Sequence, residues 1–177
     1  MVNNKKTILF TIEHKEREFI PKCFLAYNLV KRGFRVYIGT FVTIDRVAKQ
    51  IGPSIIFHKS TFVAKSAYYK SLGHKFVFMD EEGGITIPRS SIESFCKHRY
   101  RTVCKEREDV VFLPGKSFEN YILRMKNVQG VPFYATGWPR VDLWREEYQY
   151  LYDSKVQEIK TKYGKYYLLI TSFGMTD

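Results

Sequence analysis

The chain has 177 residues, of which 45% are hydrophobic, and its 29 Lys and Arg outnumber 18 Asp and Glu to give a formal charge of +11. This length fits one domain or two small ones, and the 13 Tyr and 14 Phe exclude a globally disordered chain. The positive charge favours anionic partners, such as nucleotides, phospholipid surfaces or nucleic acid, without choosing among them. A basic surface that serves only solubility is the alternative.

The three cysteines, Cys23, Cys96 and Cys104, lack CxxC spacing, which argues against a zinc site and against a disulfide framework. We therefore expect no metal and no bound cofactor. No apolar run approaches the roughly 20 residues of a membrane span. These features predict a reduced, soluble, cytoplasmic chain that can contact the inner membrane face only peripherally.

The first forty residues predict a βαβ unit. Thr7–Ile12 is a short apolar run, typical of a strand buried on both faces. A helix follows, with Pro21 in its first turn and Gly33 as its stop, and then a second strand from Phe34 to Ile38. Helical spacing predicts that its buried face consists of Phe19, Ile20, Cys23, Phe24, Tyr27 and Val30.

The alternation of strands and helices continues to about residue 135. The further predicted strands are 54–57, 75–79, 110–113 and 132–135, and the further predicted helices are 44–51, 61–72, 90–107 and 117–125. Such alternation predicts an α/β fold with an open, mostly parallel, Rossmann-like sheet covered by helices on both faces.

The pattern changes after residue 136. Thr136–Arg140 is a turn-rich break, followed by a charged helical stretch from about Leu143 to Tyr163 and by an apolar run from Tyr166 to Thr171. We therefore expect a Rossmann-like domain over 1–135, a hinge and helix over 136–165, and the first strand of a truncated second domain over 166–177.

Three polar segments are predicted to follow the carboxyl ends of strands, where open α/β sheets bind ligands. They are Glu13–Arg17, Asp80–Gly84 and Pro114–Lys116. In the second segment, adjacent carboxylates repel one another, so at least one pKa should rise and produce a candidate general base, Glu82 or Glu81. A solvated acidic turn is the alternative.

The other candidate contacts would bind an anion. His14, Lys15 and Arg17 can form charge-assisted hydrogen bonds, with Gly83 and Lys116 at the same edge of the sheet. An exposed charged loop that caps the first helix is the alternative. The basic run 89–107 fits either a phosphate-binding surface or the wet face of a helix, and His58, His74 and His98 are expected in loops or on the surface.

Three common motifs are absent from the sequence. No GxGxxG follows the first strand, which disfavours a nicotinamide-dinucleotide domain. No GxxxxGK[ST] occurs, which excludes a P-loop kinase, and no GxSxG occurs, which argues against an α/β-hydrolase.

Several segments together resemble the bacterial surface carbohydrate (polysaccharide) biosynthesis proteins, over about residues 7–174. The first block reads IEHKERE from Ile12, LAYNLVKRG from Leu25 and VYIG from Val36. The later blocks read SLGHK from Ser71, DEEG from Asp80, TGWPRVD from Thr136 and YGK from Tyr163. In the third of these later blocks, Trp138 stands where the family signature has Asn.

The resemblance implies the N-terminal, acceptor-side half of a GT-B glycosyltransferase, which transfers a sugar from a nucleotide-activated donor to a glycan or lipid-linked acceptor. It implies Glu82, then Glu81, as general base, with His14, Lys15 and Arg17 on the acceptor side. Gly137, Pro139, Arg140 and Asp142 would form the hinge. Transfer is expected to need the donor half. A non-catalytic module for an anionic membrane or nucleic acid, or an inactive remnant, is the alternative, although no specific nucleic acid is expected.

Overall fold

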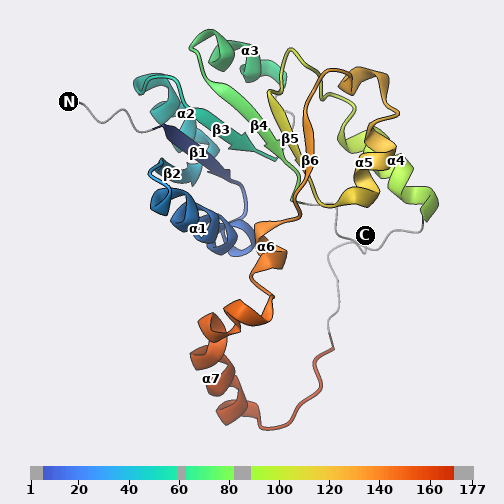
Figure 1. The fold of residues 1–177 in the computed structure, drawn as a ribbon. Coiled ribbons are helices and arrows are strands. Elements are labelled where there is room, and N and C mark those ends of the chain that lie inside the picture. The colour runs from blue at the N-terminus through green and yellow to red at the C-terminus, as the bar shows by residue number, and fades with distance from the viewer. Residues whose placement is uncertain (1–5, 60–62, 82–88, 170–177) are drawn as a thin grey trace, which may run out of the picture. The chain divides into compact units, whose positions relative to one another are not determined.

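Six parallel strands form one open sheet in the computed structural model, which describes residues 6–59, 63–81 and 89–169 (Figure 1). The strands are short and rich in β-branched and aromatic residues, as buried parallel strands usually are. Their bounds are β1 Thr7–Ile12, β2 Arg35–Thr40, β3 Ile55–His58, β4 Lys75–Met79, β5 Val110–Leu113 and β6 Phe133–Ala135.

A helix connects each strand of the sheet to the next. The connecting helices are α1 Lys15–Lys31, α2 Phe41–Gln50, α3 Val63–Ser71, α4 Arg89–Arg99 and α5 Lys116–Ile122, with a 3₁₀ turn at Lys126–Val128. After β6, a short helix α6 spans Pro139–Asp142. The predicted α/β fold with a parallel, Rossmann-like sheet is confirmed.

The strand order is β2-β1-β3-β4-β5-β6, and all neighbouring strands pair in parallel. The chain therefore leaves β1 toward one edge, to form β2, and returns past β1 to continue toward the other edge. The strands on which this direction reverses, β1 and β3, lie side by side, with Phe10 paired to Phe57. This reversal is the position at which doubly wound sheets bind ligands.

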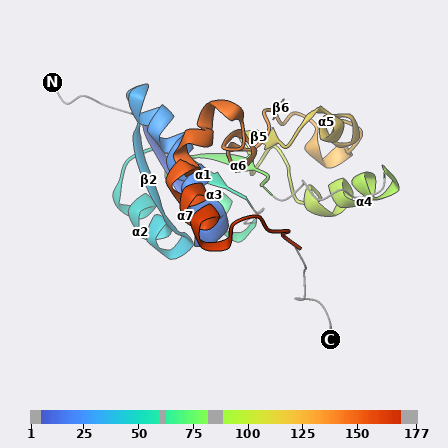
Figure 2. The ribbon, with the colours of Figure 1, turned by 90° about the horizontal axis from the view of Figure 1, so that it is seen from below.

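Alternate residues of β1 pack against different helices. Ile8 and Phe10 are buried with Ala26 of α1, whereas Leu9 is buried with Ile44 of α2 and other residues on the opposite face. A third cluster joins β4 and β5 to α4 and α5, which lie on the side of β5 and β6, away from β2, in Figure 2. The helices therefore cover both faces of the sheet, as a parallel sheet requires.

The predicted buried face of α1 is wrong. Its fully buried residues are Glu18, Pro21, Lys22 and Ala26, whereas Phe19, Ile20, Tyr27 and Val30 are exposed, and Cys23 and Phe24 are half-buried. The helix also begins at Lys15, so Pro21 lies in its second turn and removes the backbone hydrogen bond to Arg17. The spacing of apolar residues predicted the wrong buried face because the inward face of α1 carries a buried ion network.

Two further predictions are corrected by the structure. The helix predicted over 90–107 ends at Arg99, because Tyr100 and Val103 turn into the core under β4 and β5. His58 and His74, expected in loops or on the surface, are buried, and only His98 is exposed.

The contacts divide the chain into two units, Met1–Asp142 and Leu143–Asp177. The second unit contains a 3₁₀ helix, Glu146–Tyr152, and α7, Asp153–Tyr163, neither of which has a buried residue. Residues 166–169 form no strand, and 170–177 lie outside the described residues, so the predicted strand of a second domain stays a prediction. None of the helices described is both long and apolar enough to cross a lipid bilayer.

Candidate functional site

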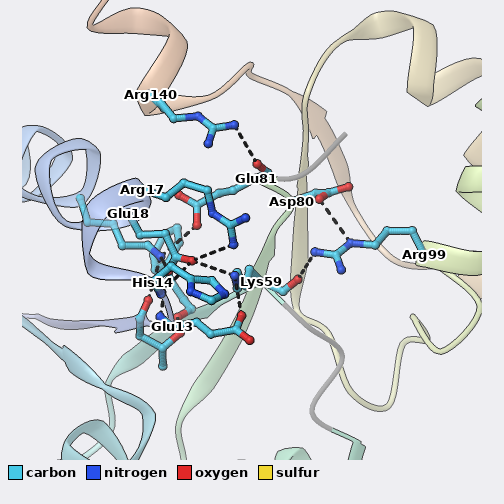
Figure 3. Close-up of polar contacts among 12 residues, drawn as sticks. Glu13, His14, Arg17, Glu18, Lys59, Asp80, Glu81, Arg99 and Arg140 are labelled. Atoms are coloured by element: carbon cyan, nitrogen blue, oxygen red, sulfur yellow. Dashed lines mark hydrogen bonds and ion pairs between the residues drawn. The ribbon is translucent and has the colours of Figure 1, made fainter. Parts of the chain in front are cut away.

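The carboxylate of Glu18 lies at the centre of a buried ion network at the carboxyl ends of β1 and β3 (Figure 3). It accepts hydrogen bonds from the backbone N–H groups of Glu13 and His14, at 3.0 and 3.4 Å. It also accepts bonds from the ammonium groups of Lys22, at 2.9 Å, and Lys59, at 2.7 Å. One side chain therefore fixes the loop after β1 and ties α1 to the end of β3.

These contacts keep Glu18 ionised although it is buried. Burial alone would raise its pKa, but the bonds from Lys59, from the Glu13 N–H and from Lys22 outweigh burial and lower the pKa to about 2. A carboxylate that accepts several charged or backbone donors is expected to behave in this way. Glu18 therefore carries its charge throughout the ordinary pH range.

Lys22 connects the first strand to the fourth. Its ammonium group donates to the carbonyl oxygen of Thr11, at 2.8 Å, and to Glu18, and it lies 2.9 Å from Oε2 of Glu81. The contact with Glu81 is an ion pair rather than an aligned hydrogen bond, because the buried Oε2 has no hydrogen-bond partner among the described residues. Lys22 thus holds two carboxylates from different elements around one cation.

Glu81 is the titratable group of this network whose proton affinity is increased. Burial raises its pKa, the nearby cation of Lys22 opposes that rise, and the charge of Glu18 adds to it. A guanidinium nitrogen of Arg140, from α6, lies 3.5 Å from the backbone oxygen of Glu81. Glu81 is therefore a buried carboxyl, next to a lysine, at the carboxyl end of β4.

Asp80 faces away from Glu81, as successive residues of an extended segment do. Its fully buried carboxylate accepts a 2.5 Å hydrogen bond from Tyr100 and lies 3.3 Å from Nε of Arg99. The charge of Asp80, after burial, raises the pKa of Tyr100. Asp80 therefore anchors the end of α4 to β4 and does not share a site with Glu81.

This geometry corrects the expected cause of the raised pKa. The sequence predicted mutual repulsion among adjacent carboxylates, whereas burial is the largest cause at Glu81, and the like charge that contributes is Glu18 from α1. Glu82 and Gly83, the first predicted base and its glycine neighbour, lie outside the described residues, so their roles stay predictions.

The predicted anion contacts have different surroundings in the structure. Arg17 is 3.4 Å from Glu18 and belongs to the network, whereas His14 and Lys15 are exposed at the start of α1. Lys116 is exposed at the start of α5, after β5, and takes part in no ion pair of the described network. The anion site predicted from these residues and Gly83 therefore stays a prediction.

The residues predicted as a hinge lie at the end of the first unit. Gly137 has φ +81°, a left-handed conformation that favours glycine, and α6 runs from Pro139 to Asp142. Arg140 reaches back to Glu81 and also lies over the ring of Trp138, 5.7 Å from its centroid. Arg140 is thus a member of the site as well as part of this segment.

Sequence reasoning missed Glu18, Lys22 and Lys59. The signals were present: Glu18 and Lys22 have the i, i+4 spacing of a helical ion pair, and Lys59 directly follows the buried strand β3. Glu13, 63% exposed, pairs with the same Lys59. Charged residues are usually expected on the surface, whereas Glu18, Lys22 and Lys59 are buried.

Within the described ranges, no group of three His, Cys, Asp or Glu side chains is placed to hold a metal ion. The three cysteines are free thiols. Comparison of the chain with protein-family models, with curated proteins and with solved structures gives no match.

Proposed function

We propose that this chain is the acceptor-side domain of a glycosyltransferase for surface polysaccharide, which moves a sugar from a nucleotide-activated donor to a glycan or lipid-linked acceptor. The observation that supports the proposal is Glu81, a buried carboxyl with a raised pKa beside Lys22. It lies at the edge of the sheet where α/β folds bind ligands. The motif resemblance in the same segment, DEEG from Asp80, points to the same chemistry.

The proposed reaction needs a base at this edge. As the acceptor hydroxyl oxygen forms a bond to the anomeric carbon, its proton passes to a carboxylate of Glu82 or Glu81. The bond from the anomeric carbon to the nucleotide phosphate breaks, and the phosphate leaves with the electron pair. A base works best when its pKa lies near the working pH, and burial moves the pKa of Glu81 in that direction.

Lys22 and Arg140 would position this segment rather than react. Lys22 holds the Glu81 carboxyl through its charge, and Arg140 lies 3.5 Å from the backbone oxygen of the same residue. Both contacts fix the chain immediately before Glu82. The donor and its nucleotide would be held mainly by a second domain.

The basic run 89–107 gives little support to a nucleic-acid module. Arg99 donates to the Lys59 carbonyl at 2.6 Å, Arg107 donates to the Thr102 carbonyl, and Lys97 pairs with Glu93. Cations that are engaged within the protein are less available to phosphates, which applies to Arg99 and Arg107, while Lys97, Arg101 and Lys105 are exposed. The glycosyltransferase proposal is therefore preferred to that alternative.

Sugar transfer by the protein in the form that the cell makes tests the proposal, with a panel of labelled nucleotide sugars and a membrane extract as acceptor. Glu82→Gln or Glu81→Gln should lower kcat by about 10²-fold or more with little change in the acceptor KM. The matched control is Glu93→Gln, which removes an exposed carboxylate of α4 and should keep full activity. Full activity in both test variants, or no transfer from any donor, would contradict the proposal.

A further inference from the structure

The outward face of α1 is apolar. Ile20, Tyr27 and Val30 are 56%, 61% and 56% exposed, and Phe19 is 39% exposed. At about 100° per residue, these positions fall within one arc of about 100° on the helix, and half-buried Cys23 falls in the same arc. The apolar positions run from Phe19, in the second turn, to Val30 near the end of the helix, whereas Glu16 occupies the same arc in the first turn.

The inward face of the same helix explains why these apolar residues are left outside. Glu18 and Lys22 point into the ion network, and Pro21 and Ala26 are buried beside them. An exposed apolar patch of this kind on a globular protein commonly marks an interaction site. The inward side of α1 therefore combines buried charge with apolar contacts of Ala26, Leu25 and Leu29, and a separate apolar stripe lies outside.

Cations flank the stripe at both ends. Lys15 is exposed at the start of the helix, and Lys31 and Arg32 are exposed at its end. The Lys31 ammonium group lies 5.1 Å from the centroid of the Tyr27 ring, so it is held beside the apolar face. Glu16 is the exposed acidic residue in this arc, and the chain as a whole carries +11.

We propose that this face of α1, defined by Phe19, Ile20, Tyr27 and Val30, docks on an anionic lipid bilayer. The apolar side chains would enter the boundary between headgroups and acyl chains, while Lys15, Lys31 and Arg32 contact lipid phosphates. Amphipathic helices with aromatic residues and flanking lysines bind membrane surfaces in this orientation. The inference does not depend on the proposed function.

A lipid surface fits this face better than a second copy of the chain. In a two-fold dimer the same patch meets itself, so the cations at the ends of one helix would approach those of the other. Like charges that face each other across an interface are unfavourable, whereas an anionic bilayer complements them. The positions of the cations therefore favour an anionic bilayer over a second copy of the chain as the partner of this face.

Docking would also place the candidate site near the membrane. Glu18 and Lys22 lie on the opposite side of the same helix from the apolar stripe, so one helix diameter, about 10 Å, separates them. A lipid-linked acceptor held in the bilayer would then lie within reach of the carboxyl ends of β1 and β4.

Vesicle flotation tests the inference with the full chain and no sugar donor, using phosphatidylcholine alone and phosphatidylcholine with about one-third phosphatidylglycerol. We expect binding to the anionic vesicles only, and a steep loss when salt rises from about 0.1 M to about 1 M. The triple variant Ile20→Ser, Tyr27→Ser, Val30→Ser should bind at least about tenfold more weakly. Lys15→Glu with Lys31→Glu should have a comparable effect through charge alone.

The matched control is Val42→Ser with Leu123→Ser, which removes an apolar side chain of α2 and one directly after α5 that are 68% and 63% exposed. It should bind like the unmodified chain. Equal loss in this control, equal binding to neutral vesicles, or no binding to anionic vesicles would overturn the inference. The inference would also be overturned if light scattering showed that the unmodified chain is a dimer and that the triple variant is a monomer. Because flotation needs no sugar transfer, its outcome is independent of the enzyme assay.

Discussion

Glu18 of α1 and Lys59 at the end of β3 form a buried 2.7 Å ion pair although 41 residues separate them in the sequence. The pair spans the two strands at which the sheet reverses its direction of growth. Lys22 joins Glu18 on the other side and carries the network on to Glu81. The first, third and fourth strands are thus connected by charge as well as by their backbone ladders.

Glu18→Gln should destabilise the fold, because it leaves Lys22 and Lys59 buried with less negative charge. Breaking a buried ion network in this way typically costs about 3 kcal/mol, measured by urea unfolding. Glu158→Gln, which removes the exposed partner of Lys155, is the control and should cost under about 0.5 kcal/mol. Equal losses in the two variants would show that the Glu18 network adds no stability.

Acid should weaken the protein through the same carboxyl. The pKa of Glu18 is about 2 in the folded chain against an ordinary value of 4.5, so its contribution is complete above pH 4.5 and is lost as the pH falls toward 2. The shift corresponds to about 3 kcal/mol. The difference in unfolding free energy between the unmodified chain and Glu18→Gln should therefore shrink over this range, and a constant difference would contradict the assignment.

His74 should make stability depend on pH in a higher range. Burial lowers its pKa, although its bond to the Ala48 carbonyl opposes this, and Nδ1 accepts the Ser54 N–H at 3.1 Å. The neutral ring is therefore the native form, and its contribution is present above pH 6.5 and decreases as the pH falls below that value. Replacement by Gln should flatten this part of the stability profile.

The control for this prediction is His98→Gln, because His98 is exposed on α4. Urea midpoints measured at about pH 7.5 and about pH 5.5 give the comparison, since the two values lie on either side of an ordinary histidine pKa. If the two variants show the same pH dependence, the buried ring is not the cause.

Tyr100→Phe tests the structural role of Asp80. The change leaves the fully buried carboxylate without its 2.5 Å hydrogen bond, and we expect a loss of about 1 to 3 kcal/mol in unfolding free energy. Tyr69→Phe is the matched control, since Tyr69 donates to Asp45, which keeps Lys49 and Lys65 as partners. A loss in Tyr100→Phe no larger than that in the control would contradict this role of the Tyr100–Asp80 hydrogen bond.

The strands were predictable because each is a short apolar run in a polar context, and β4 and β5 lie at the expected residues. The inward face of α1 was not predictable from the sequence, because hydrophobic periodicity assigns the apolar residues of a helix to the core. Here Glu18 and Lys22 occupy the core and bond to groups that are distant in sequence. The buried pair of His58 and Glu108 was not predicted either, because the two residues are 50 positions apart in the sequence.

Topology predicts that Glu13 and Asp80 begin loops at one edge of the sheet, since parallel strands bring their carboxyl ends together, and both residues follow strands β1 and β4 there. Topology does not predict the direction in which each side chain of these loops points. Asp80 and Glu81 are adjacent, yet one bonds to Tyr100 and the other lies beside Lys22. Only three-dimensional contacts show which of two neighbouring carboxyls is anchored and which has the raised pKa.

The strand order also has a consequence for the order of assembly during synthesis. β3 is added beside β1, and from β4 onward each new strand is added beside its predecessor at the same growing edge, so no later strand is inserted between two that already pair. Glu13, Glu18, Lys22 and Lys59 all belong to the first 59 residues, and Glu81 follows directly after β4. The charged centre can therefore form while β5 and β6 are still being translated, whereas the core cluster around Phe78 is completed only when β5, α4 and α5 have been added.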